Sequence, residues 1–142
     1  MYDERLVSPM REDLTRVGFT ELRTVEDVDA ALPDGRGTTL VVVNSVCGCS
    51  ARMARPAVRM ALQASPVRPD HLVTVFAGQD AEATARVRSC LTGYPPSSPC
   101  IAIFANGTLS FMMERWQIEG RAADAIADDL VAAFKAHCTA AT

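Results

Sequence analysis

The stretch TTLVVVNSVCGCSARMARPA, residues 38–57, places two cysteines between a strand and a helix. Its first eight residues are β-branched and continuously apolar at their centre, which is typical of a strand covered on both faces. The segment from Ser50 to about Ala64 predicts a helix, which Pro56 interrupts because proline removes a backbone hydrogen bond. Cys47 and Cys49 therefore follow a buried strand and precede the first turn of a kinked helix.

Strands and helices alternate outward from this stretch. The predicted elements are, in chain order, a helical arm capped by Ser8, a short strand at 19–24, a helix at 25–32, the strand at 38–45, the kinked helix, a strand at 71–78, a helix at 81–91 capped by Asp80, two strands at 100–105 and 108–114 joined by an Asn106-Gly107 turn, and a helix at 121–137. This β-α-β-α-β-α-β-β-α order predicts an α/β fold whose central mixed sheet is largely parallel, with an antiparallel pair at the final hairpin. It is the element order of a thioredoxin-like domain. We expect one such domain over residues 1–142, with residues 1–18 as an N-terminal helical extension.

The composition is that of an ordinary globular protein. Of 142 residues, 49% are hydrophobic and 22% are charged, and the formal net charge is -3. This balance creates no general basic field, so we expect no nucleic-acid partner. No apolar run approaches the roughly 20 residues that span a bilayer, and the acidic start at residues 1–5 is unlike a secretory signal. We therefore expect a cytoplasmic protein with no membrane partner.

Five cysteines are unusual for a chain in a reducing compartment. Structural disulfides are rare there, and clustered cysteines are typically catalytic, redox-sensing or metal-binding. The odd number also argues against a fully paired disulfide framework. Cys90 and Cys100 lie in apolar patterns typical of the core, whereas we expect Cys138 to be exposed at the end of the last helix. The pair Cys47 and Cys49 is the candidate functional site.

The position of Cys47 favours a reactive thiolate. Unpaired backbone N–H groups and the positive end of the helix macrodipole both stabilise a thiolate at a helix N-terminus. Cys47 is the first of the pair and lies where the strand ends, so we expect it to be the more exposed sulfur and the nucleophile. Arg52 and Arg55 in the following turns either add positive potential or are solvated surface arginines.

Cys49 is harder to assign. A disulfide between cysteines two positions apart requires a bent backbone, because an extended pair lies near the upper limit of the usual Cα separation. Gly48 makes the bend accessible through a positive φ angle. Such a disulfide would be strained and easily reduced, which suits the resolution of mixed disulfides on other molecules.

Two other interpretations of the cysteines are open. As small core residues they would be inert, although two cysteines around a glycine at a strand-to-helix junction are uncommon as core residues. As ligands, Cys47, Cys49 and Cys100 would form a metal-binding or iron–sulfur module. His71 and His137 offer no zinc-like spacing to complete such a site.

A second motif, PPSSPCIAIF at residues 95–104, places Pro99 directly before a buried strand. Proline lacks the donor that an interior strand position needs, so Pro99 must lie at the entry of the strand. Its local sequence fits an ordinary turn proline as well as a cis proline. In thioredoxin-like folds, however, this proline lies beside the catalytic cysteines and leaves a backbone edge free for a substrate strand. We therefore expect a cis Pro99.

Together, VNSVCGCSARMARPA (43–57), PPSSPCIAIF (95–104) and WQIEGR (116–121) resemble the bacilliredoxins, thioredoxin-like proteins with a CGC motif. The resemblance covers most of the chain and includes the arm SPMREDLTRVGFTEL (8–22). It implies a thioredoxin-like fold and thiol–disulfide exchange. The exchange removes bacillithiol, or a similar low-molecular-weight thiol, from modified cysteines of client proteins. Weak disulfide isomerase activity is a further trait that the resemblance implies.

The resemblance also implies roles for single residues. Cys47 is the nucleophile, Cys49 its CGC partner and Pro99 the cis proline. We expect Gly48 and Ser98 to contact the substrate beside them. The partners are S-thiolated client proteins and a small thiol that acts as co-substrate, and we expect no bound cofactor or metal.

One departure from the family pattern concerns Cys100, which follows the proline where another small residue is common, so an additional thiol is expected near the site. The carrier thiol is a second open point, because a host without bacillithiol would use a different one. The motif MMERWQIEGR (112–121) adds Arg115 and Arg121, whose fork geometry suits a carboxylate of a small thiol. A helix cap with surface charges is the alternative, and we include Arg115 among the substrate-binding residues.

Overall fold

A five-stranded sheet with the order β1-β3-β2-β4-β5 carries the cysteine loop. The computed structural model of the protein describes residues 1–138. The strands are β1 (Thr20–Glu21), β2 (Thr38–Asn44), β3 (His71–Phe76), β4 (Cys100–Ala105) and β5 (Thr108–Met113). Strands β1 and β2 pair with β3 in parallel, whereas β4 is antiparallel to both β2 and β5. The sheet is therefore mixed, as predicted, but its antiparallel part already begins at the β2–β4 pair.

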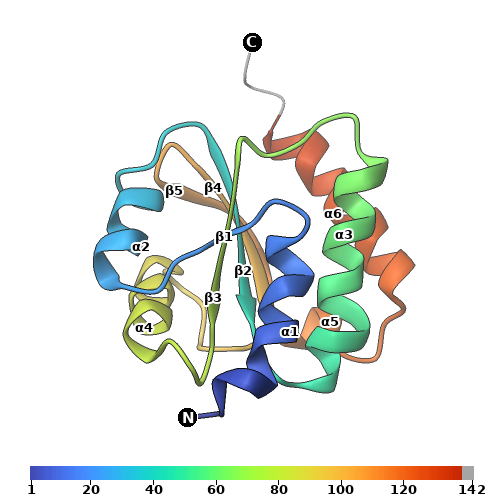
Figure 1. Cartoon of the computed structure of the whole chain (residues 1–142). Coiled ribbons are helices and arrows are strands. Elements are labelled where there is room, and N and C mark those ends of the chain that lie inside the picture. The colour runs from blue at the N-terminus through green and yellow to red at the C-terminus, as the bar shows by residue number, and fades with distance from the viewer. Residues whose placement is uncertain (139–142) are drawn as a thin grey trace.

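Helices cover both faces of this sheet. They are α1 (Glu4–Thr15), α2 (Val25–Ala31), α3 (Arg55–Ala64), α4 (Ala81–Cys90), α5 (Arg115–Ile118) and α6 (Ala123–His137), and a π-helical turn, η1 (Ser50–Ala54), precedes α3. In Figure 1, α2 and α4 lie on one face, and α1, α3 and α6 lie on the other. Within residues 1–138, none of the helices combines the length and apolarity needed to cross a bilayer.

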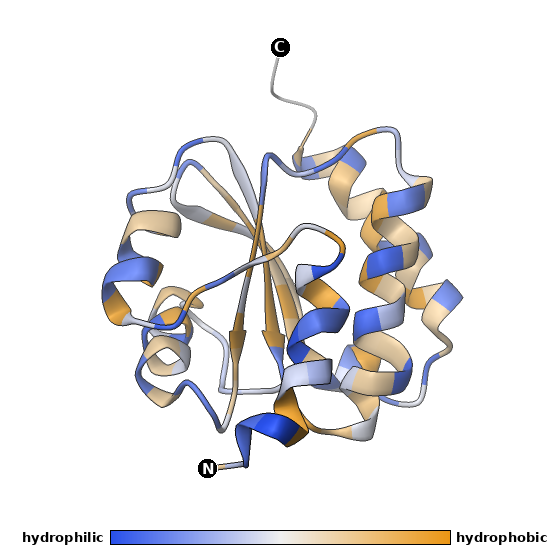
Figure 2. Cartoon of the chain, in the orientation of Figure 1, coloured by the Kyte–Doolittle hydropathy of each residue, from blue (hydrophilic) through white to orange (hydrophobic). Residues whose placement is uncertain are grey.

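Strand β2 is buried along its whole length, because its side chains alternate between two apolar clusters. Leu40 and Val42 join the cluster that contains residues of α1, α3 and α6. Val41 and Val43 join the cluster that contains residues of α2 and α4. Figure 2 shows the consequence as hydrophobic strands between helices that carry hydrophilic residues. A strand between two helical layers needs apolar residues on both faces, which explains the unbroken apolar run.

The helix after β2 changes its winding ahead of the proline. Residues Ser50–Ala54 form the π-helical turn, and Pro56 then lies in the first turn of α3. The Arg55 N–H donates to the Ser50 carbonyl across this wide turn, and Pro56, which has no N–H to donate, follows it directly. The predicted interruption is therefore real, but it takes the form of a wider turn before Pro56.

The predicted hairpin turn joins β4 to β5. Asn106 has a φ angle of 50° and Gly107 one of 84°, as a turn with two left-handed residues requires. A Cβ atom at Gly107 would lie 2.6 Å from the carbonyl oxygen of Pro33. Glycine is needed here both for its backbone conformation and for this close approach.

Helix α1 begins earlier than the sequence pattern suggests. Asp3, and not Ser8, caps it by accepting a hydrogen bond from the Arg5 backbone N–H. Pro9 lies inside the helix. The acidic residues near the start of the chain, Asp3 and Glu4, are thus the cap and the first residue of α1.

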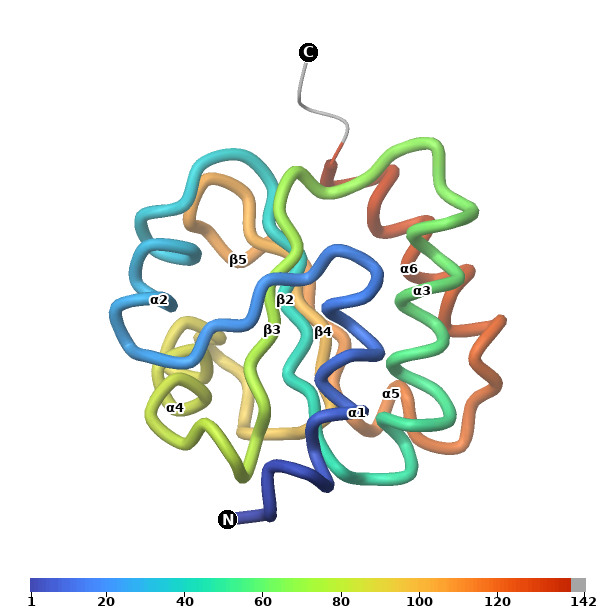
Figure 3. The backbone as a smooth tube through the Cα atoms, viewed as in Figure 1, coloured from blue at the N-terminus to red at the C-terminus, as the bar shows by residue number. Residues whose placement is uncertain are grey.

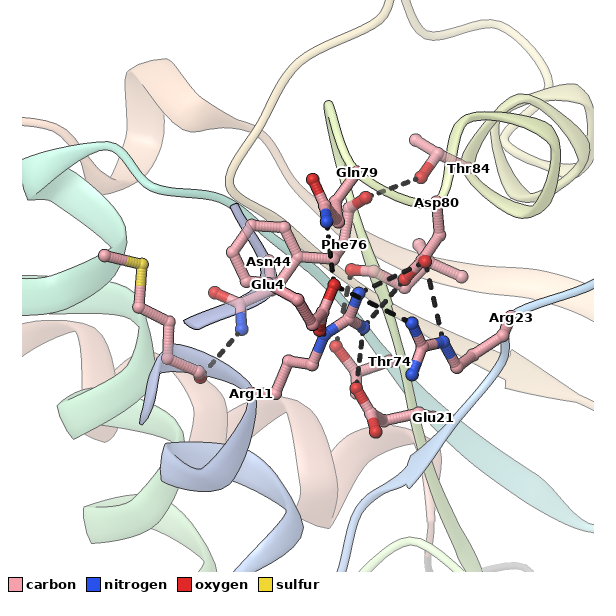
Figure 4. Close-up of polar contacts among 12 residues, drawn as sticks. Glu4, Arg11, Glu21, Arg23, Asn44, Thr74, Phe76, Gln79, Asp80 and Thr84 are labelled. Atoms are coloured by element: carbon pink, nitrogen blue, oxygen red, sulfur yellow. Dashed lines mark hydrogen bonds and ion pairs between the residues drawn. The ribbon is translucent and has the colours of Figure 1, made fainter. Parts of the chain in front are cut away.

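A buried arginine fastens α1 to the sheet (Figure 4). The Arg11 side chain is 7% exposed and donates through Nε to Glu4 at 2.6 Å. Its Nη1 donates to Glu21 at 2.7 Å and to Asp80 at 2.8 Å. Asp80 precedes α4 as predicted, but its side chain makes no capping hydrogen bond, and its carboxylate binds Arg11. The guanidinium also lies 5.3 Å from the centre of the Phe76 ring.

Candidate active site

The CGC loop follows β2 and lies beside the segment that leads into β4. Val43 pairs with Cys100 in the antiparallel ladder, so the residues after β2 face the residues before β4. Figure 3 shows the β2–α3 connection, the segment that leads into β4 and helix α5 at the same end of the strands. Arg115 of α5 contacts the Ser98 carbonyl, and Glu119, which directly follows α5, contacts Cys49, so these segments meet around the cysteines.

The surroundings of Cys47 favour a thiolate. Its sulfur accepts a hydrogen bond from the Cys49 backbone N–H at 3.3 Å. Burial raises the pKa of Cys47, but hydrogen bonds from the backbone N–H and thiol of Cys49, the Ser50 N–H and the charge of Arg115 outweigh it. The pKa of Cys47 therefore lies below its ordinary value. The predicted effect of a helix start is present, with a side chain from a different helix added to it.

The surroundings of Cys49 shift its pKa in the opposite direction. Burial raises its pKa first, the hydrogen bond and charge of Cys47 raise it further, and Glu119 adds to the effect while Arg115 opposes it. Both thiols are free and half-buried, so greater exposure of Cys47 is not what separates them. The difference is electrostatic: the first sulfur favours the thiolate and the second favours the thiol.

Gly48 differs from the sequence expectation. It is not among the residues with positive φ, so the free-thiol form does not use the left-handed conformation that we expected glycine to provide. A Cβ atom added at Gly48 would meet nothing within 4 Å. Gly48 thus lies on an open surface next to both sulfurs, where another chain can approach.

Asn44 organises the base of the loop from the end of β2. Its Oδ1 accepts hydrogen bonds from the Ser45 N–H at 2.9 Å and from the Ser50 hydroxyl at 2.8 Å. Its Nδ2 donates to the Met10 carbonyl at 3.1 Å, which ties the loop to α1. The Ser45 hydroxyl in turn accepts from the Cys47 N–H at 3.2 Å. Sequence reasoning missed Asn44.

Arg55 also stabilises the base of the CGC loop. The residue is only 4% exposed, so it is not the solvated surface arginine that the sequence allowed, whereas Arg52 is exposed. Its Nη1 donates to Asn44 Oδ1 at 2.9 Å and to the Ser45 carbonyl at 3.0 Å. Its Nε binds the Asp13 carboxylate at 3.0 Å. Arg55 therefore holds the loop in place and does not contact the sulfurs.

Pro99 lies where the sequence predicts, and the Ser98–Pro99 peptide bond is cis. The Ser98 carbonyl accepts a hydrogen bond from Arg115 Nη1 at 3.3 Å. Cys100 immediately follows but turns into the apolar cluster between the sheet and α2 and α4. Burial raises the pKa of Cys100 to about 12, against a hydrogen bond with Ser97. Cys100 is thus a core residue and not an additional reactive thiol.

The remaining two cysteines also lie outside the site, and Cys90 is half-buried at the end of α4. Cys138 is 5% exposed, which corrects the expectation of an exposed thiol, and burial raises its pKa. Its side chain joins the apolar cluster that α3 and α6 share, because the last turn of α6 returns to the sheet. Among residues 1–138, no three His, Cys, Asp or Glu side chains gather to hold a metal ion. Cys100, the third ligand of the metal-binding alternative, packs in the apolar cluster beneath α2 and α4.

The sequence did not predict helix α5, although the motif MMERWQIEGR (112–121) that contains it was singled out. Gln117 Oε1 accepts from the Glu114 N–H at 2.9 Å and closes a capping box. Arg115 Nε binds Glu119 at 2.7 Å, one turn away. Arg121 instead binds the Gln117 carbonyl, and it also pairs with an aspartate of α6. The two arginines therefore do not form one carboxylate site. Of the two, Arg115 is the one whose charge lowers the pKa of the cysteines.

Trp116 stands beside Arg115 on α5. Its ring is largely in solvent, with 72% of its surface exposed. The indole N–H donates to Glu114 at 2.9 Å. A large exposed aromatic residue next to the cysteine surface offers apolar contact area to a partner.

Replacing Arg115 by glutamine is expected to raise the pKa of Cys47, because the positive charge that favours the thiolate is lost. Alkylation of Cys47 by iodoacetamide should slow roughly threefold at neutral pH and be unchanged at alkaline pH, where the thiol is ionised in any case. Peptide mass spectrometry across a pH series measures this. Arg121→Gln is the matched control, since Arg121 faces α6. Superimposable pH profiles for Arg115→Gln and the wild type would refute the role of Arg115.

Comparisons with known proteins assign the chain to a family. A family described as Disulphide isomerase matches residues 2–138. The chain is 54% identical over 138 residues to a bacilliredoxin of Salinibacter ruber. The matched region covers 96% of this chain and 81% of that protein. It is 48% identical over 137 residues to a bacilliredoxin of Geobacillus kaustophilus, covering 96% of this chain and 94% of that protein.

Solved structures with a similar fold include thioredoxins. Mitochondrial thioredoxin 3 of Saccharomyces cerevisiae has a TM-score of 0.58 at 16% identity, over 87% of this chain and 98% of that chain. A thioredoxin of Malassezia sympodialis has a TM-score of 0.59 at 14% identity, over 86% of this chain and 92% of that chain. This likeness confirms the predicted fold. The chain therefore belongs to the bacilliredoxin family and is a thiol–disulfide oxidoreductase with a thioredoxin-like fold.

Proposed function

We propose that this protein removes bacillithiol, or a similar low-molecular-weight thiol, from mixed disulfides on the cysteines of client proteins. The observation that supports this best is the unequal pair of sulfurs, with a thiolate favoured at Cys47 and a thiol at Cys49. The bacilliredoxin names of close relatives support the same assignment. The reaction would take place in the cytoplasm, where free small thiols are abundant.

The proposed reaction has two exchanges. The Cys47 thiolate attacks the sulfur of the small thiol, a disulfide forms between them, and the client sulfur leaves as a thiolate that takes up a proton. A second small thiol then attacks the sulfur of the bound one, and the two leave as a symmetric disulfide that frees Cys47. Alternatively, Cys49 attacks the Cys47 sulfur, forms the Cys47–Cys49 disulfide and releases the small thiol. Each step breaks one disulfide and forms another, so no external oxidant or reductant enters until the final disulfide is reduced.

The residues around the cysteines would bind the substrate. The open surface at Gly48 admits the client chain, and the backbone at Ser98 and Pro99 offers an edge next to the sulfurs. Arg115 lies between this edge and Glu119, where it could also contact a carboxylate of the small thiol. Weak disulfide isomerase activity would follow from the same exchange chemistry on disulfides of misfolded proteins.

A client with one bacillithiolated cysteine tests this function. Reduced protein is expected to strip the adduct, and mass spectrometry should find its mass on the peptide that contains Cys47. Clients modified with glutathione or cysteine, run in parallel, identify the preferred small thiol. Protein alkylated with iodoacetamide beforehand is the control. A client that keeps its adduct with all three modifications would exclude the proposed function.

A further inference from the structure

Glu119 contacts the second cysteine from outside the CGC loop. The Cys49 thiol donates to Glu119 Oε2 at 3.8 Å, and the same oxygen accepts from Arg115 Nε at 2.7 Å. The groups that face Cys49 are Cys47 from its own loop, Arg115 from α5 and Glu119, which caps the end of α5. Cys49 is thus placed between one cation and two groups that favour its protonated form.

Cys47 and Glu119 do not carry negative charge in the same states of the reaction. Cys47 carries negative charge only as a thiolate, and it loses that charge once it forms a disulfide with the small thiol. Glu119 stays ionised throughout, because its hydrogen bond and ion pair with Arg115 hold the pKa of its carboxyl group below the ordinary value. In the mixed-disulfide state, Glu119 is therefore the negative charge that remains beside Cys49.

We propose that Glu119 restrains Cys49 while the small thiol is attached to Cys47, so that the adduct passes to a second small thiol before Cys49 can release it. This inference rests on the proposed function and specifies how its second step is divided. The restrained step is the loss of the Cys49 proton to solvent, followed by attack of the Cys49 sulfur on the Cys47 sulfur. The disulfide to the small thiol breaks, and the small thiolate leaves and takes up a proton.

Replacing Glu119 by glutamine tests the restraint, because the side chain keeps its size and loses its charge. Protein is loaded with one bacillithiol on Cys47 at acidic pH, using the symmetric bacillithiol disulfide, and then mixed to higher pH without free thiol. Rapid-quench mass spectrometry measures the release of bacillithiol. We expect Glu119→Gln to release it roughly fivefold faster at neutral pH, with the pH profile displaced to lower pH. The rates should converge at alkaline pH, where Cys49 is ionised in both proteins.

Two control variants isolate the effect. Glu12→Gln also removes one carboxylate from an exposed pair one helical turn apart, with Arg16 at 3.8 Å, but it lies on α1. Its release rate should equal that of the wild type. In the Cys49→Ala background, release without added thiol should be absent with either residue at position 119, because the faster release requires the Cys49 sulfur.

The outcomes separate the restraint from the function. Release by Glu119→Gln at the wild-type rate, or more slowly, would overturn the restraint, and a slower rate would make Glu119 a proton acceptor. Loading from the symmetric disulfide does not need a client protein. The restraint can therefore hold even if the protein fails to strip a bacillithiolated client, and that failure would overturn only the proposed function.

Discussion

Cys47→Ser is expected to lower the rate of bacillithiol removal from a client by a factor on the order of 10³ or more, because a serine hydroxyl neither ionises at neutral pH nor forms a disulfide. The other thiols do not replace it. Cys49 faces Glu119, and Cys100 is buried with a pKa of about 12. The measurement is the loss of adduct from the client by mass spectrometry, compared with the uncatalysed exchange.

Cys49→Ser is the matched substitution. It should leave the first transfer close to the wild-type rate and, when free small thiol is scarce, accumulate the adduct on Cys47. A Cys47→Ser protein that clears the client within tenfold of the wild-type rate would place the nucleophile elsewhere. Loss of the adduct from Cys47 of Cys49→Ser at the wild-type rate without added thiol would remove Cys49 from the second step.

The largest effect on stability is expected for Arg11→Met, at about 3 kcal/mol of the free energy of unfolding. The substitution leaves Asp80, whose side chain is 9% exposed, as a buried carboxylate without its main partner. Arg23 lies 3.6 Å from Asp80 and compensates in part, which places the loss at the lower end for a broken buried pair. Urea unfolding measures the change, and the melting temperature should fall by roughly 10 °C.

Two further variants test the explanation. Arg16→Met removes a 70% exposed arginine from the same helix and should change stability by less than about 0.5 kcal/mol. The double variant Arg11→Met with Asp80→Asn should regain part of the loss, because the unpaired charge is gone. A loss below about 1 kcal/mol for Arg11→Met would show that apolar packing alone holds α1 to the sheet.

The parts of the fold that the sequence predicts depend on neighbours along the chain. The apolar run of β2, the Asn106-Gly107 turn and the cysteines after a strand are all local patterns, and the structure confirms them. The cis bond before Pro99 is also confirmed, although local sequence fits an ordinary turn equally well. The catalytic roles of Cys47 and Cys49 stay predictions that the experiments above address.

The supporting arginines were missed because their partners are distant in sequence. Arg55 binds Asp13 across 42 positions, and Arg11 binds Asp80 across 69. A signal was nevertheless present in the helical spacing. Arg11 lies on the stripe of buried residues that includes Leu14, and Arg55 lies on a similar stripe in α3. An arginine is almost never fully buried unless it is paired, so an arginine in register with core residues indicates a partner elsewhere in the fold.

Helix α5 was missed for a different reason. It has only four residues, too few for a periodic pattern to identify. The sequence motif pointed to Arg115 as a carboxylate ligand, whereas in the folded chain its first partner is Glu119. That pairing brings a negative charge to Cys49, which no spacing along the chain could indicate because the two residues are 70 positions apart.

The exposed Trp116 ring on α5 is an intrinsic fluorescent probe of client binding. Trp116 is the single tryptophan of the chain, so all indole fluorescence originates beside the cysteine surface. A client that covers this ring removes it from water, and its emission then moves to shorter wavelength. Binding of unlabelled clients that lack tryptophan can therefore be followed in real time, separately from the sulfur chemistry that mass spectrometry records.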